Sequence, residues 1–140
     1  MDTLELRYQV PGDDFSRAGE ASSSVKRTLK ELGFPPALVR RVAIAMYEAE
    51  INMVIHAEGG EVTAQITPEQ IDIEFADVGP GIPDIDLAMQ EGYSTASADV
   101  RDLGFGAGMG LPNMKKYADD MQISSVLGVG TTVLLQFQVV

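Results

Sequence analysis

The sequence predicts an α+β fold, a two-layer sandwich with helices on one side of a β-sheet. Three observations support this prediction. Strand-like segments come in neighbouring pairs with short connections, helical segments lie between these pairs, and one helix is apolar on nearly all sides. Hairpin-like neighbours with helices to one side favour this sandwich over a doubly wound parallel sheet.

The first half of the chain predicts one strand followed by two helices. Residues 4–10 alternate between apolar and polar side chains, as in a half-buried strand. A helix is expected from a cap at Ser16 to about Leu32, where Gly33 ends it. A second helix is expected from about 37 to 57, stopped by Gly59-Gly60. Its apolar surface predicts a position in the middle of the domain.

The second half predicts two pairs of strands separated by helices and a long glycine-rich loop. The expected elements are strands at 61–66 and 70–76, a short helix near 85–91, a helix at about 111–119, and strands at 121–126 and 131–140. Residues 92–108 between the two helices are long, polar and rich in glycine, which is typical of a functional lid or a disordered segment.

Size and composition limit the classes of protein that this chain can represent. Its 140 residues, 45% of them hydrophobic, fit one domain spanning 1–140. The formal net charge of -11 disfavours direct binding to nucleic acid or to anionic lipid. The absence of cysteine excludes disulfides and thiolate chemistry. With no signal peptide and no apolar segment near the roughly 20 residues of a membrane span, a cytoplasmic location is expected.

The second predicted helix carries a polar stripe of Glu48, Asn52 and His56, spaced four residues apart. A buried carboxylate is costly unless it is paired or has a chemical role. The stripe is therefore either a polar edge that reaches solvent, with His56 beside the helix C-terminus, or part of a site. Its spacing is not that of a zinc site, whereas an Asn oxygen suits a hard cation such as Mg²⁺.

Asp77 ends a predicted strand and is followed by Gly79 and Gly81. It can simply cap the turn, as aspartates before glycine often do. Alternatively, its carboxylate accepts a hydrogen bond from an exocyclic amine such as that of adenine. The two glycines then matter because they have no Cβ to obstruct the ligand.

A second glycine cluster, residues 104–110, precedes the helix predicted from about Leu111. Its spacing fits neither the P-loop nor the dinucleotide-binding motif. It does offer unhindered N–H groups that lead into a helix N-terminus, which is a physical anion site. A flexible surface loop is the alternative, and Arg101 is either a phosphate ligand or a solvated side chain.

Four motifs, in this order, resemble the ATP-binding domain shared by DNA gyrase B, the MutL proteins and histidine kinases, the GHKL superfamily. They are Glu48–Ala57, Asp77–Ile82, Gly106–Leu111 and Gly128–Val133. The chain is most similar to the small stand-alone anti-sigma-factor and stress-switch serine kinases, and the resemblance extends from Leu4 to Val139. It implies a mixed sheet covered on one face by helices, with the nucleotide held between helices and sheet.

The resemblance implies ATP and Mg²⁺ as cofactors and assigns roles to individual positions. Glu48 would be the general base, and Asn52 would coordinate the magnesium ion. Asp77 would accept the adenine amino group, supported by Thr131 or Thr132, and lid glycines would donate N–H groups to phosphate. The expected nucleotide-binding positions are Asn52, Asp77, Gly79, Gly81, Ile82, Arg101, Gly106, Gly108, Met109, Gly110, Leu111, Thr131 and Thr132.

The function that the resemblance implies is that of a protein serine/threonine kinase acting on a small antagonist or scaffold protein. A sigma factor would be a second partner, and homodimerisation is common among such kinases. One alternative is an ATP-sensing module that controls a partner by lid closure without phosphoryl transfer. Another is a diverged domain without nucleotide, which Glu48, Asn52 and Asp77 argue against. Glu50 adds a second carboxylate beside the base, and its orientation is open.

Overall fold

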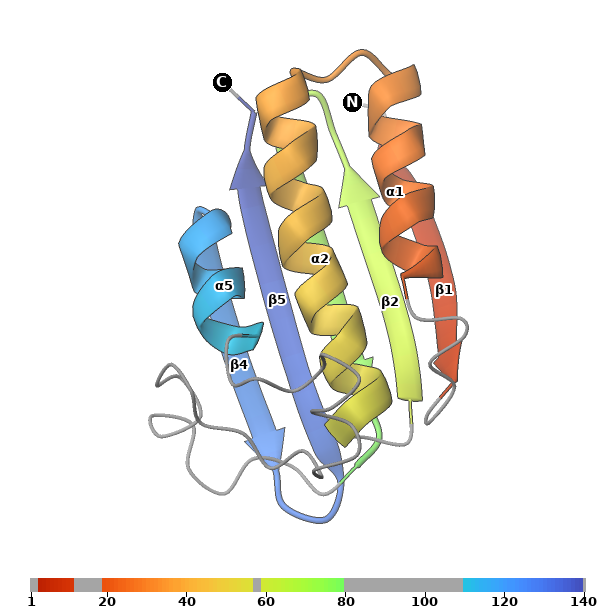
Figure 1. The fold of residues 1–140 in the computed structure, drawn as a ribbon, viewed down its shortest axis with the longest axis vertical. Helices are drawn as coiled ribbons and strands as arrows, with labels where there is room; N and C mark the ends of the chain where they lie inside the picture. Colours follow the sequence, from red (N-terminus) through yellow and green to blue (C-terminus); the bar gives the residue numbers. More distant parts are fainter. Residues whose placement is uncertain (1–2, 12–18, 57–58, 80–109, 140) are drawn as a thin grey trace, which may run out of the picture.

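The computed structural model describes residues 3–11, 19–56, 59–79 and 110–139. Within these residues a five-stranded sheet forms one layer and three helices form the other (Figure 1). The strands lie in the order β1-β2-β3-β5-β4. In chain order the elements are β1 Leu4–Pro11, α1 Glu20–Glu31, α2 Pro36–His56, β2 Gly59–Ile66, β3 Gln70–Asp77, α5 Gly110–Tyr117, β4 Asp120–Val126 and β5 Gly130–Gln138.

The predicted sandwich with helices on one face is confirmed, but the expected mixture of parallel and antiparallel strands is wrong for the described residues. All four strand pairs of the sheet are antiparallel. The reason is the position of β5, which lies between β3 and β4. Strands β3 and β4 run in the same direction, and β5 keeps these two from becoming neighbours. The helix expected near 85–91 and the loop at 92–108 lie outside the described residues.

Two predicted boundaries are corrected by glycines. Helix α1 begins at Glu20 rather than near Ser16, which lies outside the described residues, because Gly19 adopts the left-handed conformation at φ 96°. Gly59 and Gly60 do more than stop α2, since they form the first two residues of β2. Gly60 pairs with Asp77 on β3, where a side chain at position 60 would collide with the neighbouring main chain.

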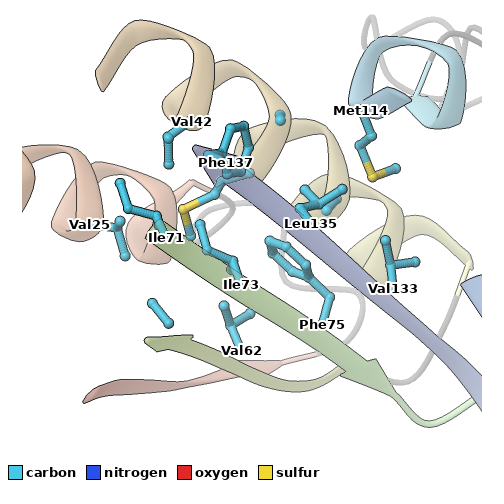
Figure 2. Packing of buried hydrophobic residues seen from close by; sticks show 14 of the residues in the cluster. Val25, Val42, Val62, Ile71, Ile73, Phe75, Met114, Val133, Leu135 and Phe137 are labelled. Atoms are coloured by element: carbon cyan, nitrogen blue, oxygen red, sulfur yellow. The ribbon is translucent and has the colours of Figure 1, made fainter. Parts of the chain in front are cut away.

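The core lies between α2 and the helix face of the sheet (Figure 2). Alternate residues of the three inner strands β2, β3 and β5 point into it, as strand periodicity requires. Helix α2 crosses the middle of the sheet, with α1 on one side and α5 on the other (Figure 1). The predicted central position of α2 is therefore confirmed. The buried side chains labelled in Figure 2 are Val25, Val42, Val62, Ile71, Ile73, Phe75, Met114, Val133, Leu135 and Phe137.

None of the helices in the described part of the chain combines the length and the apolar character needed to cross a lipid bilayer. The opposite face of the sheet is polar, as in antiparallel sheets with one solvated side. Arg7, Glu74 and Gln136 belong to this face, because each alternates along its strand with residues that pack toward the helices.

Candidate functional site

Asp77 is the last residue of β3, the middle strand of the sheet. Its side chain lies on the helix face, because it follows the buried Phe75 by two positions. Asp77 Oδ1 accepts a hydrogen bond of 2.8 Å from the backbone N–H of Thr131. Burial raises the pKa of the Asp77 carboxyl, and the hydrogen bond from Thr131 offsets part of this effect. A further donor, such as a ligand amine, would stabilise the charged carboxylate.

Glycines on both neighbouring strands allow the main chain to come close to Asp77. A Cβ added to Gly130 on β5 would collide with the Asp77 carbonyl oxygen and lie 3.1 Å from Asp77 Oδ1. A Cβ added to Gly60 on β2 would collide with the Ala76 carbonyl oxygen and lie 2.7 Å from Asp77 Cα. The end of β3 is thus held between two strands at a distance that only glycine permits.

Helix α2 brings the two other principal candidates to the same end of the molecule. Glu48 and Asn52 are half-buried and one helical turn apart, each preceding a buried residue, Ala49 or Met53. Met53 Cε lies 2.7 Å from the position of a Cβ on Gly60, so this part of α2 packs over the end of β3. The C-terminal turns of α2 and the end of β3 lie at one end of the sandwich (Figure 1).

The third member of the predicted stripe, His56, is the last residue of α2, and its side chain lies outside the described residues. Within the described part, no group of three or more His, Cys, Asp and Glu side chains is arranged to hold a metal ion. The half-buried amide of Asn52 fits a metal site in which the protein supplies only one or two of the ligands. Mg²⁺ usually keeps several waters and takes one or two protein oxygens together with substrate phosphates.

The structure separates the two threonines proposed to support Asp77. Thr131 is buried on the helix face of β5, its N–H binds Asp77, and its Oγ1 lies 3.1 Å from the Ser125 hydroxyl oxygen. Thr132 is half-buried and pairs with Ala76. Because successive strand residues alternate, its side chain lies on the face away from the helices. Of the two, Thr131 shares the surroundings of Asp77.

Backbone contacts fix the chain immediately after Asp77. The N–H of Val78 donates to the Gly59 carbonyl at 3.0 Å, and the N–H of Gly79 donates to the Val129 carbonyl at 3.1 Å. Helix α5 begins at Gly110, with Leu111 next, and its N-terminus faces the same end as Asp77 (Figure 1). The remaining candidates lie outside the described residues; they are Gly81, Ile82, Arg101, Gly106, Gly108 and Met109.

Glu50, whose orientation the sequence left open, takes part in a different contact. It is 2% exposed, and its carboxylate accepts hydrogen bonds from the backbone N–H groups of Gly19 at 3.0 Å, Ala21 at 3.2 Å and Ser22 at 3.0 Å. It therefore caps the N-terminus of α1 from a neighbouring helix, in place of the missing side-chain cap. The one hint in the sequence was an acid on a helix that is apolar on nearly all sides.

Comparison with known proteins shows the family to which the chain is similar. Residues 13–137 match the model of the histidine kinase-like ATPase domain. The serine/threonine-protein kinase RsbT of Bacillus subtilis is 32% identical over 112 residues, which cover 77% of this chain and 78% of RsbT. The anti-sigma F factor of Clostridium acetobutylicum is 31% identical over 142 residues, covering 95% of this chain and 91% of that protein.

A solved structure has the same fold. The RsbU and RsbW domains of a Mycobacterium tuberculosis protein superpose with a TM-score of 0.62 at 15% identity, over 98% of this chain. The match covers 32% of the solved chain, so this chain corresponds to about a third of that protein. At this identity the likeness concerns the fold alone.

Proposed function

Because the chain belongs to the family of histidine kinase-like ATPase domains, we propose that it is an ATP-dependent protein serine/threonine kinase of the anti-sigma regulatory type. Its substrate is a serine or threonine of a small antagonist or scaffold protein. The relatives named above support this proposal, since one is called a serine/threonine kinase and another an anti-sigma factor. The whole chain acts as one domain, in the cytosol.

The observation that carries the ATP site is the setting of Asp77. This carboxylate is partly buried, with one oxygen fixed by the Thr131 N–H and a glycine on each neighbouring strand. A carboxylate with a raised pKa gains from a neutral hydrogen-bond donor that arrives with the ligand. The exocyclic amine of adenine is such a donor, and Gly79 and Gly81 leave room for the ring.

Glu48 and Asn52 have the roles that phosphoryl transfer requires. The Asn52 amide oxygen would hold Mg²⁺, which would offset the negative charge of ATP in a chain of net charge -11. The Glu48 carboxylate accepts the proton of the substrate hydroxyl while the oxygen of that hydroxyl attacks the γ-phosphorus and ADP leaves. The N–H groups of Gly106, Gly108 and Gly110 donate to phosphate at the start of α5, where the helix dipole favours an anion.

The other expected ligands complete the site. Ile82, Met109 and Leu111 line it beside the glycines, and Arg101 neutralises phosphate charge. Within the chain these positions precede or open α5, the helix whose N-terminus lies at the same end of the sandwich as the end of β3 (Figure 1). A sigma factor is a second partner, and a homodimer is the proposed assembly.

The test is transfer of labelled γ-phosphate from Mg-ATP to the protein encoded by the neighbouring gene. Glu48→Ala is expected to slow this transfer about 100-fold or more, the range for loss of a general base, while ATP affinity stays within a few-fold. Glu69→Ala in the exposed β2–β3 turn is the control and should leave both quantities unchanged. Undiminished transfer in Glu48→Ala would refute the assigned base. Nucleotide-dependent binding of the partner without phosphoprotein would favour the ATP-sensing alternative.

A further inference from the structure

The two edges of the sheet differ in chemistry. Strand β1 forms one edge, and the side chains that point away from the helices on this strand carry charge. Arg7 pairs with Glu5 at 3.0 Å, and the Gln9 amide donates to Glu61 on β2 at 2.8 Å. Charged side chains are one of the devices by which proteins prevent unwanted strand pairing at a sheet edge. This edge is protected.

The opposite edge, β4, lacks that protection. From Met121 to Val140 the sequence contains no charged residue, although the whole chain has a net charge of -11. Strand β5 is the only strand that pairs with β4 in the part of the chain that the structure describes. In an antiparallel pair, alternate main-chain N–H and C=O groups of the outer strand point away from its partner. The outer side of β4 therefore presents a row of such groups, on a strand whose one charged residue, Asp120, is its first.

The apolar side chains of this edge are incompletely covered. Met121 and Ile123 pack toward the core but remain half-exposed, whereas Val133 and Leu135 on the adjacent β5 are buried. The hairpin tip that joins β4 to β5 is more open. Its residues Val126, Leu127 and Val129 are 60%, 65% and 63% exposed. Exposed apolar residues beside an open strand edge are typical of a peptide-docking site.

We propose that the outer edge of β4 binds an extended segment of a partner protein as a sixth strand. Main-chain hydrogen bonds to β4 supply affinity, and every second side chain of the segment packs against Met121 and Ile123. One end of the segment reaches the hairpin tip at Leu127. The hairpin tip adjoins the proposed ATP site, since the Val129 carbonyl accepts a hydrogen bond from the Gly79 N–H, but the inference does not rest on phosphoryl transfer.

The charge of the chain selects the occupant. A net charge of -11 disfavours an acidic segment, so the partner strand is uncharged or basic and rich in β-branched residues. A second copy of this chain would bring two bodies of charge -11 together. A seven-residue edge offers little to offset this repulsion, since stable protein pairs bury roughly 1,200 Å² or more.

The test uses a fluorescent peptide with the sequence Lys-Thr-Val-Thr-Val-Thr-Val-Lys, whose centre is uncharged and whose ends are basic. Fluorescence polarisation is expected to give saturable binding, and hydrogen exchange of residues 120–126 is expected to slow when the peptide is added. Ile123→Lys places a charge on the core side of the edge and should weaken binding about tenfold or more. Leu6→Lys, its counterpart on β1, should leave binding unchanged. The melting temperature and ATP binding of each variant report its folding.

Several outcomes would overturn the proposal. These are no peptide binding, unchanged binding in a folded Ile123→Lys variant, and protection that appears on β1 instead of β4. Slow exchange along all of β4 before the peptide is added would mean that the edge is already paired. Concentration-dependent dimers abolished by Ile123→Lys would assign the edge to a second copy. If Ile123→Lys fails to fold, the exchange pattern of the unmodified protein decides alone.

Discussion

Polar contacts differ between the two ends of helix α2. Near its C-terminus, the buried Glu50 carboxylate accepts three backbone hydrogen bonds from the start of α1. Near its N-terminus, the Arg41 guanidinium donates to the Tyr117 carbonyl at 3.1 Å and to Asp119 at 2.8 Å, at the end of α5. The side chains of Arg41 and Asp119 are each 37% exposed. Helix α1 is thus held by a buried contact, and α5 is held by a contact that is partly exposed to solvent.

The carboxylates at the two ends have pKa values that shift in opposite directions. Burial raises the pKa of Asp77, at the end where the proposed ATP site lies. The Gln138 N–H, followed by Arg41, lowers the pKa of Asp119 at the other end, in spite of a smaller opposing effect of burial. At the end with the proposed ATP site, a carboxylate is partly withdrawn from water, and hydrogen-bond donors of a ligand can stabilise its charged form. The opposite end relies on contacts that solvent and salt weaken.

The largest expected effect is that of Glu50→Ala, which removes the buried acceptor and leaves three N–H groups unpaired. We expect a loss of about 3 kcal/mol in the free energy of unfolding, measured with urea. Glu31→Ala, an exposed carboxylate at the end of α1, is the control and should cost less than about 0.5 kcal/mol. Equal losses in the two variants would contradict the special role of the contact with α1.

A smaller effect is expected for Asp77→Asn, which keeps the shape of the side chain and removes its charge. The affinity for Mg-ATP should fall about tenfold, or ~1.4 kcal/mol, while that for inorganic triphosphate changes little. In the unmodified protein, ATP affinity should decline as pH falls through the raised pKa of Asp77, because a protonated carboxyl is a poorer acceptor. Calorimetric titrations over pH measure both effects. Comparable losses for ATP and triphosphate would exclude Asp77 as the adenine ligand.

Asp77→Asn also tests how the Asp77 carboxyl changes the free energy of unfolding with pH. Because the folded-state pKa of Asp77 lies above its ordinary value of 3.8, protonation favours the folded state. This contribution is fully present below pH 3.8 and is lost as pH rises through the folded-state pKa. The difference in unfolding free energy between the protein and Asp77→Asn should therefore change within this window. A constant difference would mean that burial does not perturb the carboxyl.

The smallest effect is expected for Arg41→Ala, at the opposite end of α2. Loss of this exposed contact should cost about 0.5 kcal/mol, and less at high salt, because solvent screens the ion pair. The lowered pKa of Asp119 contributes stability above 3.8 that is lost as pH falls through the folded-state value. In the variant this acid-dependent loss should shrink in part, since the Gln138 N–H remains. Arg40→Ala, exposed and adjacent, is the control. A loss of unfolding free energy as large as that of Glu50→Ala would contradict the difference between the contacts at the two ends of α2.

The sequence predicted the elements whose side chains follow a clear period. The alternation of Ile71, Ile73 and Phe75 placed β3 correctly, and with it Asp77 at the strand end. It did not predict the exclusively antiparallel pairing, because strand order depends on contacts between segments far apart in the chain. Nor did it predict the role of Glu50, since capping by another helix leaves no local pattern. The division between Thr131 and Thr132 required the register of β5.

The position of β5 has a consequence for how the protein is made. Among the strands that the structure describes, β5 is synthesised last, yet it lies between β3 and β4 in the finished sheet. A nascent chain that ends before Gly130 lacks the Thr131 amide that holds Asp77, and β3 has no neighbour on that side. ATP binding at the proposed site would therefore have to wait until β5 has been synthesised, and a chain released before that point would present an unpaired β3 to other nascent proteins.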